Sequence, residues 1–210
     1  MSARIVTVAQ QKGGAGKTTL VVQLATAAAS AGRRVAVVDI DPQASLTGWM
    51  RIRAHRARGV PELRFAMVGG WRLGVELDRL APGVDLVLID TPPHAESDAK
   101  SAIRRADLVL VPCQPSPADI WASRATFELA AKERRPARLV WTRMPARGRV
   151  VEEARAAVAR EGWPTAVAEL GNRQVYVASF ARGLGVVEAE PRGPAGAEVR
   201  ALFEELAPLL

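Results

Sequence analysis

The chain is poor in the residues that build disulfide frameworks and metal centres. Its 210 residues include one cysteine, Cys113, and two histidines. A single cysteine cannot close an internal disulfide, and it suits a reducing compartment. Neither His55 nor His94 has a cysteine or a second histidine nearby at metal-ligand spacing. We therefore expect no disulfide framework and no zinc site.

Long apolar runs are also missing. The longest ones fall far short of the roughly 20 residues that a membrane-spanning helix needs. The first residues lead directly into an apolar strand, so we expect no signal peptide. These features predict a cytoplasmic protein without a membrane partner. With 49% apolar residues, the chain is long enough for one well-buried domain, which we place at residues 1–210.

Lysine is scarce compared with arginine. The 29 basic residues include only four lysines, and the net charge is +7 at pH 7. Excess positive charge favours an anionic partner such as nucleic acid, although the arginine bias alone is also typical of a GC-rich coding sequence. Two of the four lysines, Lys12 and Lys17, lie in one glycine-rich segment.

That segment, residues 12–19, reads Lys-Gly-Gly-Ala-Gly-Lys-Thr-Thr and follows an apolar run. Such a loop surrounds a phosphate with backbone N–H groups, while Lys17 reaches the β- and γ-phosphates and the Thr18 hydroxyl ligates Mg²⁺. The helix that begins near Lys17 adds its positive dipole end. Lys12 lies at the loop entrance, which suggests contact with a nucleotide in a second copy. The predicted nucleotide-binding residues here are Lys12, Gly13, Gly14, Ala15, Gly16, Lys17, Thr18 and Thr19.

Carboxylates follow two further apolar runs. Asp39 and Asp41 come at the end of one predicted strand, and Asp90 comes at the end of another. The carboxyl ends of parallel strands form the ligand crevice of an open sheet, so we expect all three near the phosphate loop. Asp90 would hold Mg²⁺ through its water shell opposite Thr18, and Asp41 would orient or deprotonate the attacking water. The candidate metal ligands are Thr18, Asp41 and Asp90.

Strand-like apolar runs alternate with helical stretches along the chain. This alternation predicts an α/β fold with a mostly parallel twisted sheet and helices on both faces. With the phosphate loop at residues 12–19, we expect a single-domain P-loop NTPase. We expect strands at 5–9, 35–39, 86–90, 108–112, 139–142 and 166–170. We expect helices at 17–30, 118–134, 150–160 and 198–206. The least regular stretch, residues 51–70, should form a helix and a loop.

These motifs together resemble the ParA/MinD family of deviant-Walker P-loop ATPases. The resemblance rests on residues 12–19, on Asp39-Ile-Asp41-Pro-Gln and on Asp90-Thr-Pro-Pro. The segment 111–121, Val-Pro-Cys-Gln-Pro-Ser-Pro-Ala-Asp-Ile-Trp, is similar to the proline-rich segment of small ParF-like partition ATPases. Residues 172–173 and 181–188 resemble their C-terminal part, so the similarity covers nearly the whole chain. We expect no helix-turn-helix arm before Arg4 and no sequence-specific reading of DNA.

The resemblance implies a partner-stimulated enzyme that hydrolyses ATP with Mg²⁺ and acts as a dimerisation switch. In the ATP state, Lys12 would contact the partner's phosphates, and the homodimer would bind DNA without sequence preference. Hydrolysis would release it. The implied catalytic residues are Lys12, Lys17 and Asp41. The 112–117 segment would border the base or the dimer face, with Pro112 and Pro115 as the candidate nucleotide contacts, and Arg173 is the first candidate for DNA contact.

The resemblance leaves the cargo open. A ParB-like protein or another adaptor would stimulate hydrolysis, so a nucleoid-associated protein that segregates a plasmid, a chromosome or other cargo is expected. The alternatives are a ParA-like positioner of a protein cargo, a MinD-like membrane switch and a non-hydrolysing scaffold. The membrane switch needs a basic amphipathic C-terminal helix, whereas residues 198–210 carry three glutamates and one arginine. Adenine specificity is implied only, because Thr142-Arg143 stands where many relatives have an asparagine.

Overall fold

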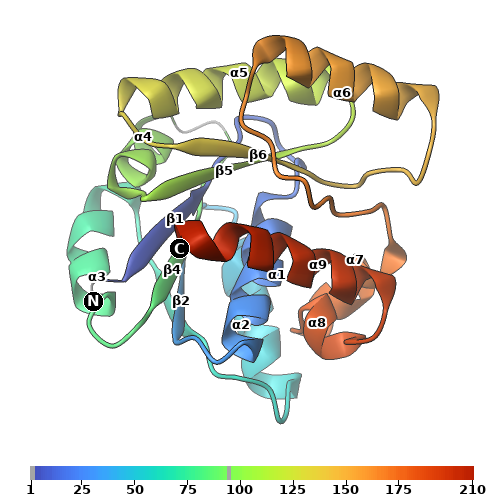
Figure 1. Cartoon of the computed structure of the whole chain (residues 1–210). Coiled ribbons are helices and arrows are strands. Elements are labelled where there is room, and N and C mark those ends of the chain that lie inside the picture. The colour runs from blue at the N-terminus through green and yellow to red at the C-terminus, as the bar shows by residue number, and fades with distance from the viewer. Residues whose placement is uncertain (1–2, 94–95) are drawn as a thin grey trace.

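A six-stranded parallel sheet forms the centre of the molecule (Figure 1). The computed structural model describes residues 3–93 and 96–210, so His94 lies outside the described part. The strands lie in the order β3-β2-β4-β1-β5-β6. Their bounds are β1 (Arg4–Val8), β2 (Val35–Asp39), β3 (Arg64–Met67), β4 (Leu86–Asp90), β5 (Leu108–Cys113) and β6 (Ala137–Trp141). This arrangement confirms the predicted α/β fold.

Helices cover both faces of the sheet. One layer contains α1 (Lys17–Ser30), α2 (Ser45–Arg56), α7 (Gln174–Phe180), α8 (Val186–Ala189) and α9 (Pro194–Leu206), which is followed by the short helix η2 (Ala207–Leu209). The opposite layer contains α3 (Leu73–Leu80), preceded by η1 (Gly70–Arg72), then α4 (Glu96–Arg105), α5 (Pro117–Lys132) and α6 (Arg149–Glu161). In Figure 1 the red helix α9 crosses in front of the sheet, whereas α5 and α6 lie on the other side.

Two-sided burial explains why the central strands are apolar at nearly every position. Val6 and Val8 of β1 pack in the cluster formed with α1 and α9. Ile5 packs on the α3 side, and the Thr7 hydroxyl donates a hydrogen bond of 3.0 Å to the Ala102 carbonyl of α4. Successive residues therefore serve opposite layers, as the pleat of a strand requires.

One predicted strand, 166–170, is wrong. The chain there runs beside β6, and Ala166 donates to the Leu139 carbonyl at 2.8 Å, but it forms only isolated bridges. The N–H groups of Val167 and Ala168 are turned to the Glu205 carboxylate of α9 instead of a neighbouring strand. A side chain from another element thus takes the hydrogen bonds that a sheet would use.

The sixth strand is β3, inside the 51–70 region predicted as helix and loop. It is a four-residue edge strand with a single buried residue, Ala66, so it lacks the apolar run that marks the central strands. Helix α2 also begins at Ser45, before the predicted region. The sequence analysis did not predict α3, α4, α7 and α8, which are short or polar.

Candidate nucleotide-binding site

The glycine-rich loop lies between β1 and α1, at the carboxyl edge of the sheet beside β4 and β5. Gly14 has φ 75° and Gly16 has φ 100°, backbone conformations that strain any residue with a Cβ atom. Gly16 caps α1, and the Leu20 N–H donates to its carbonyl at 2.8 Å. The loop therefore wraps around the positive end of α1, where a phosphate is stabilised.

Lys17 is the buried cation of this loop. Its Nζ donates to the Gln10 carbonyl at 3.0 Å and to the Lys12 carbonyl at 3.3 Å. Burial lowers its pKa, and the charges of Asp90 and Asp41 oppose that shift. An ammonium held this close to the loop backbone, in a poorly solvated position, is well placed to bind a polyphosphate.

Thr18 and Asp90 form the part of the site that fits Mg²⁺. The Thr18 hydroxyl donates to Asp90 Oδ2 at 2.7 Å. Among the described residues, Asp90 Oδ1 is buried without a hydrogen-bond partner. Burial raises the pKa of Asp90 to about 7, while the hydrogen bond from Thr18 opposes that shift. A divalent cation would satisfy this carboxylate.

The two protein oxygens at this point, the Thr18 hydroxyl and the Asp90 carboxylate, suit magnesium. Mg²⁺ usually takes one or two protein oxygens and completes its shell with substrate phosphates and water. Thr18 and Asp90 would hold it together with a bound nucleotide, and the ion would neutralise phosphate charge.

The two aspartates at the end of β2 have different surroundings. Asp39 Oδ2 accepts hydrogen bonds from the Thr47 N–H at 2.9 Å and its hydroxyl at 2.7 Å, so it anchors the start of α2. Asp39 Oδ1 accepts from the Asp41 N–H at 3.1 Å. Asp41 lines the cavity and bonds locally to the Gln43 N–H at 2.9 Å. Asp39 thus positions Asp41, which is the carboxylate that faces the nucleotide site.

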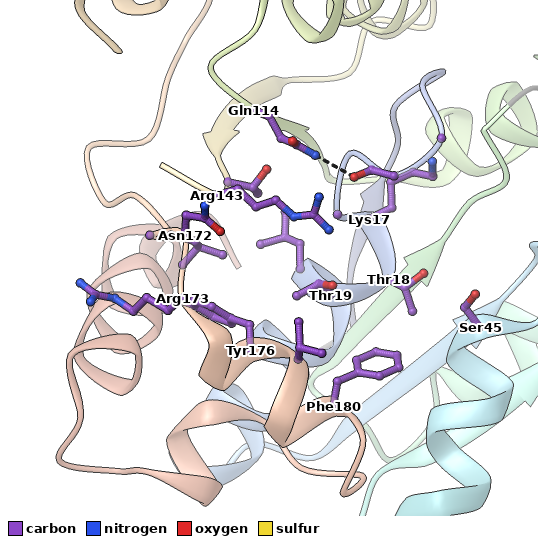
Figure 2. A pocket seen from close by; sticks show the side chains of 18 of the residues that line it. Lys17, Thr18, Thr19, Ser45, Gln114, Arg143, Asn172, Arg173, Tyr176 and Phe180 are labelled. Carbon is purple, nitrogen blue, oxygen red and sulfur yellow. Dashed lines mark hydrogen bonds between the residues drawn. The ribbon is translucent and has the colours of Figure 1, made fainter. Parts of the chain in front are cut away.

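A cavity of about 1080 Å³ extends from the phosphate loop to the C-terminal part of the chain (Figure 2). Gln114 closes one side of the loop by donating to the Gly14 carbonyl at 2.7 Å. The predicted residues that line the cavity are Gly13, Gly14, Gly16, Lys17, Thr18, Thr19, Asp41, Pro115 and Arg173. Lys12, Ala15, Asp90 and Pro112 are not among the lining residues. Pro112 lies within β5, where it pairs with Val140.

Lys12 is held by its own chain. Its Nζ forms an ion pair with Asp119 of α5, a carboxylate that also accepts a hydrogen bond from the Ser116 hydroxyl. The Asp119 side chain is 1% exposed, whereas that of Lys12 is 39% exposed. Contact with a nucleotide in a second copy would require Lys12 to leave Asp119, and this cross-subunit role stays a prediction.

The far end of the cavity contains residues that the sequence analysis did not assign to nucleotide binding. They are Arg143, Asn172, Gln174, Tyr176, Val177 and Phe180. Figure 2 shows Arg143 directed into the cavity towards the phosphate loop, whereas Arg173 points away from it. The Arg173 guanidinium is bound by Glu198 of α9. DNA contact by Arg173 stays a prediction.

Comparison with known proteins identifies the family. The family of the CobQ/CobB/MinD/ParA nucleotide binding domain matches residues 6–186. This chain belongs to that family. The maintenance of carboxysome distribution protein A of Halothiobacillus neapolitanus is 30% identical over 209 residues, 96% of this chain and 95% of the relative. The chromosome-partitioning ATPase Soj of Thermus thermophilus is 36% identical over 137 residues, 53% of this chain and 55% of Soj.

Solved structures of this family share the fold. MinD of Pyrococcus furiosus matches with a TM-score of 0.81 at 20% identity, covering 99% of this chain and 100% of MinD. The ATP complex of McdA from Cyanothece matches with a TM-score of 0.79 at 16% identity, covering 99% of this chain and 96% of McdA. MinD of Pyrococcus horikoshii, solved with Mg-ADP, matches with a TM-score of 0.77 at 18% identity, covering 99% of this chain and 97% of that MinD. Family members thus bind ATP and Mg-ADP, in keeping with the predicted cofactors.

Proposed function

We propose that this chain is a partner-stimulated ATPase of the ParA type, a dimerisation switch that positions a protein assembly on nonspecific DNA. The alignment with a carboxysome distribution protein over 95% of that relative's length carries this proposal. Soj, named for chromosome partitioning, aligns over about half of its length. The sequence analysis placed plasmid or chromosome cargo first and protein cargo as an alternative. The comparisons favour the alternative.

The residues in and beside the cavity support an assignment of roles. Lys17 and the loop N–H groups bind the ATP phosphates, and Thr18 and Asp90 hold Mg²⁺, which neutralises phosphate charge. Asp41, whose backbone N–H is fixed by Asp39, orients the attacking water. Lys12 leaves Asp119 and contacts the phosphates of the partner's ATP. These steps make dimerisation depend on ATP and make release depend on hydrolysis.

The runner-up function, a MinD-like membrane switch, has less support. In the part of the chain that the structure describes, no helix is long and apolar enough to cross a membrane, but such a switch would use an amphipathic helix at the membrane surface, so α9 is the element that bears on it. The apolar face of α9 is buried in the core, with its largest side chains being Val199, Leu202, Phe203 and Leu206. A helix that uses its apolar face to pack on the domain does not offer that face to lipid.

The substitution Asp41→Ala tests the proposed switch. We expect it to leave ATP binding intact, to abolish hydrolysis and to prolong the ATP-dependent complex with DNA. The measurement is binding to a nonspecific DNA duplex with ATP or ADP, alongside phosphate release. The DNA affinity should rise at least about tenfold with ATP and should fall steeply with salt concentration, because phosphate contacts release counterions.

Anionic liposomes serve as the second ligand in the same experiment. DNA binding that does not depend on the nucleotide would contradict the proposed switch. Binding of the ATP form to liposomes but not to DNA would replace it with the membrane switch. Substituting the exposed Asp78 of α3 by alanine provides a charge-matched control, which should hydrolyse ATP as the unchanged protein does.

A further inference from the structure

The segment that forms the far end of the cavity is held by two glutamates of α9. Glu198 and Glu205 lie seven residues apart in that helix, and both accept hydrogen bonds from the extended chain that follows α6. Glu205 binds the N–H groups of Val167 and Ala168, each at 2.9 Å. Glu198 binds the next part of the segment, which borders the cavity.

Glu198 makes four hydrogen bonds there. It accepts from the Gly171 N–H at 3.0 Å, from Arg173 Nε at 2.8 Å and from Arg173 Nη2 at 2.6 Å. The fourth donor is the Tyr176 hydroxyl at 2.9 Å. Burial raises the pKa of Tyr176, so its hydroxyl keeps the proton that it donates. One carboxylate therefore links Gly171 and Arg173 of the loop to Tyr176 of the following helix, α7.

The residues that Glu198 binds are themselves cavity residues. Gly171, Arg173 and Tyr176 all line the cavity, and Asn172 between them does so too. The absence of a side chain at Gly171 permits the contact, because a Cβ atom there would lie 3.1 Å from Glu198 Oε1. This part of the cavity lies beyond the phosphate loop. Because that loop is the part that fits the phosphates, we take the sugar and base of a nucleotide in the same cavity to extend towards residues 171–176.

We propose that Glu198 is a positioning residue for the sugar and base end of the nucleotide site. Its carboxylate fixes residues 171–176 in the conformation that binds this end, while the phosphate end is formed without it. The inference rests on the proposed function, because it takes the ligand of this cavity to be ATP. The structure supports a division of labour along α9, in which Glu198 serves the site and Glu205 serves the fold alone.

Glu205 supplies a matched control. It lies on the same helix, binds two backbone N–H groups of the same segment and pairs with Arg138 at 3.0 Å. Its side chain is 21% exposed, compared with 20% for Glu198. None of its partners lines the cavity. Any effect that comes only from loosening this segment should therefore appear in both variants.

The experiment compares the unchanged protein with Glu198→Gln and Glu205→Gln by isothermal titration. The ligands are Mg-ADP and inorganic tripolyphosphate, which has neither sugar nor base. We expect Glu198→Gln to weaken Mg-ADP binding about tenfold, because glutamine cannot replace all the charge-assisted hydrogen bonds, and to change tripolyphosphate binding less than about twofold. Glu205→Gln should leave both affinities unchanged. In steady-state assays, Glu198→Gln should raise KM for ATP and leave kcat unchanged.

Two outcomes would overturn the inference: Mg-ADP binding by Glu198→Gln that equals that of the unchanged protein, or an equal loss for both ligands. A second variant, Gly171→Ala, pushes on the carboxylate without removing it and should reproduce the selective loss in part. If the unchanged protein did not bind Mg-ADP and did not hydrolyse ATP, the proposed function would be rejected, and the inference with it. Thermal unfolding of each variant identifies a change that merely unfolds the chain.

Discussion

The two ends of the nucleotide cavity are built in different ways. The phosphate end consists of contiguous motifs at strand ends, and its ionisable groups, Lys17 and Asp90, are buried. The far end is assembled from the residues after β6 and from residues 170–181, and several of its side chains, Asn172 among them, are exposed. At the phosphate end, backbone geometry places the functional groups. At the far end, the distant helix α9 places residues 171–176 through Glu198.

This difference predicts how each end responds to change. Loop geometry at the phosphate end is set by Gly14, Gly16 and the start of α1, so single substitutions there act on binding directly. At the far end, residues 171–176 depend on their anchor Glu198, whereas Arg143 is exposed and lies outside that anchor, so substitutions there should have smaller effects. Lys17→Ala and Arg143→Gly test the two ends of the cavity, and Asp119→Asn tests Lys12, which lies outside the cavity.

The largest effect should come from Lys17→Ala. Removing the buried ammonium deletes its charge-assisted hydrogen bonds to the phosphates, and we expect nucleotide binding to weaken at least about a hundredfold. Titration with Mg-ADP and with tripolyphosphate should show the same loss, because Lys17 acts on the phosphates alone. Lys132→Ala, at the exposed end of α5, is the control. A much smaller loss of affinity for tripolyphosphate than for Mg-ADP would contradict the assignment of Lys17 to the phosphate end alone.

The sequence predicted the phosphate end because its signals are local. The glycine spacing and Lys17 belong to one short motif, and Asp41 and Asp90 follow apolar strands whose carboxyl ends meet at one edge. The same reasoning applies to Arg143, which follows β6 in the same way, but the sequence analysis did not assign it to nucleotide binding. Residues 170–181 carry no such signal, because their placement depends on side chains of α9 that are distant in sequence.

The fold likewise was predicted where the signal is local and missed where it depends on distant elements. Strands β2 and β4 have the predicted bounds, because continuous apolar runs mark strands covered on both faces. Strand β3 was missed because an edge strand needs little apolar surface. The segment 166–170 was predicted as a strand because its apolar pattern does not show that Glu205 accepts hydrogen bonds from its N–H groups. Alternating runs predict the layers of the molecule. Side-chain anchors between distant elements do not show in the sequence.

An intermediate effect is expected from Asp119→Asn. The substitution removes the carboxylate that holds Lys12, so the lysine is free to contact a second copy. The ATP-bound dimer should then form at a protein concentration several-fold lower, as measured by sedimentation in the hydrolysis-deficient Asp41→Ala background. Binding of Mg-ADP by the monomer should not change, because neither Lys12 nor Asp119 lines the cavity.

Combining Asp119→Asn with Lys12→Ala provides the control for that experiment. If release of Lys12 is the cause, the double variant should lose the gain in dimerisation entirely. If Asp119→Asn left the dissociation constant of the dimer unchanged, the ion pair would not restrain Lys12. A gain that persists without Lys12 would place the effect elsewhere on α5.

The smallest effect is expected from Arg143→Gly, and it should have opposite signs for stability and for binding. Arg143 has φ 50°, a left-handed conformation that costs a residue with a Cβ atom free energy and directs this side chain into the cavity. Glycine adopts this conformation without strain, so the free energy of unfolding should rise by about 0.5 kcal/mol after the entropic cost of glycine. Mg-ADP binding should weaken a few-fold as the guanidinium is lost.

Arg134→Gly separates these two consequences. Arg134 follows α5 with φ 56°, almost the same backbone conformation, and it is not among the cavity residues. Its replacement should raise the free energy of unfolding by a similar amount and leave Mg-ADP binding unchanged. Denaturant titration and calorimetry on both variants measure the two quantities independently. If Arg143→Gly stabilised the fold without weakening binding, the left-handed backbone at Arg143 would serve the turn after β6 and not the nucleotide site.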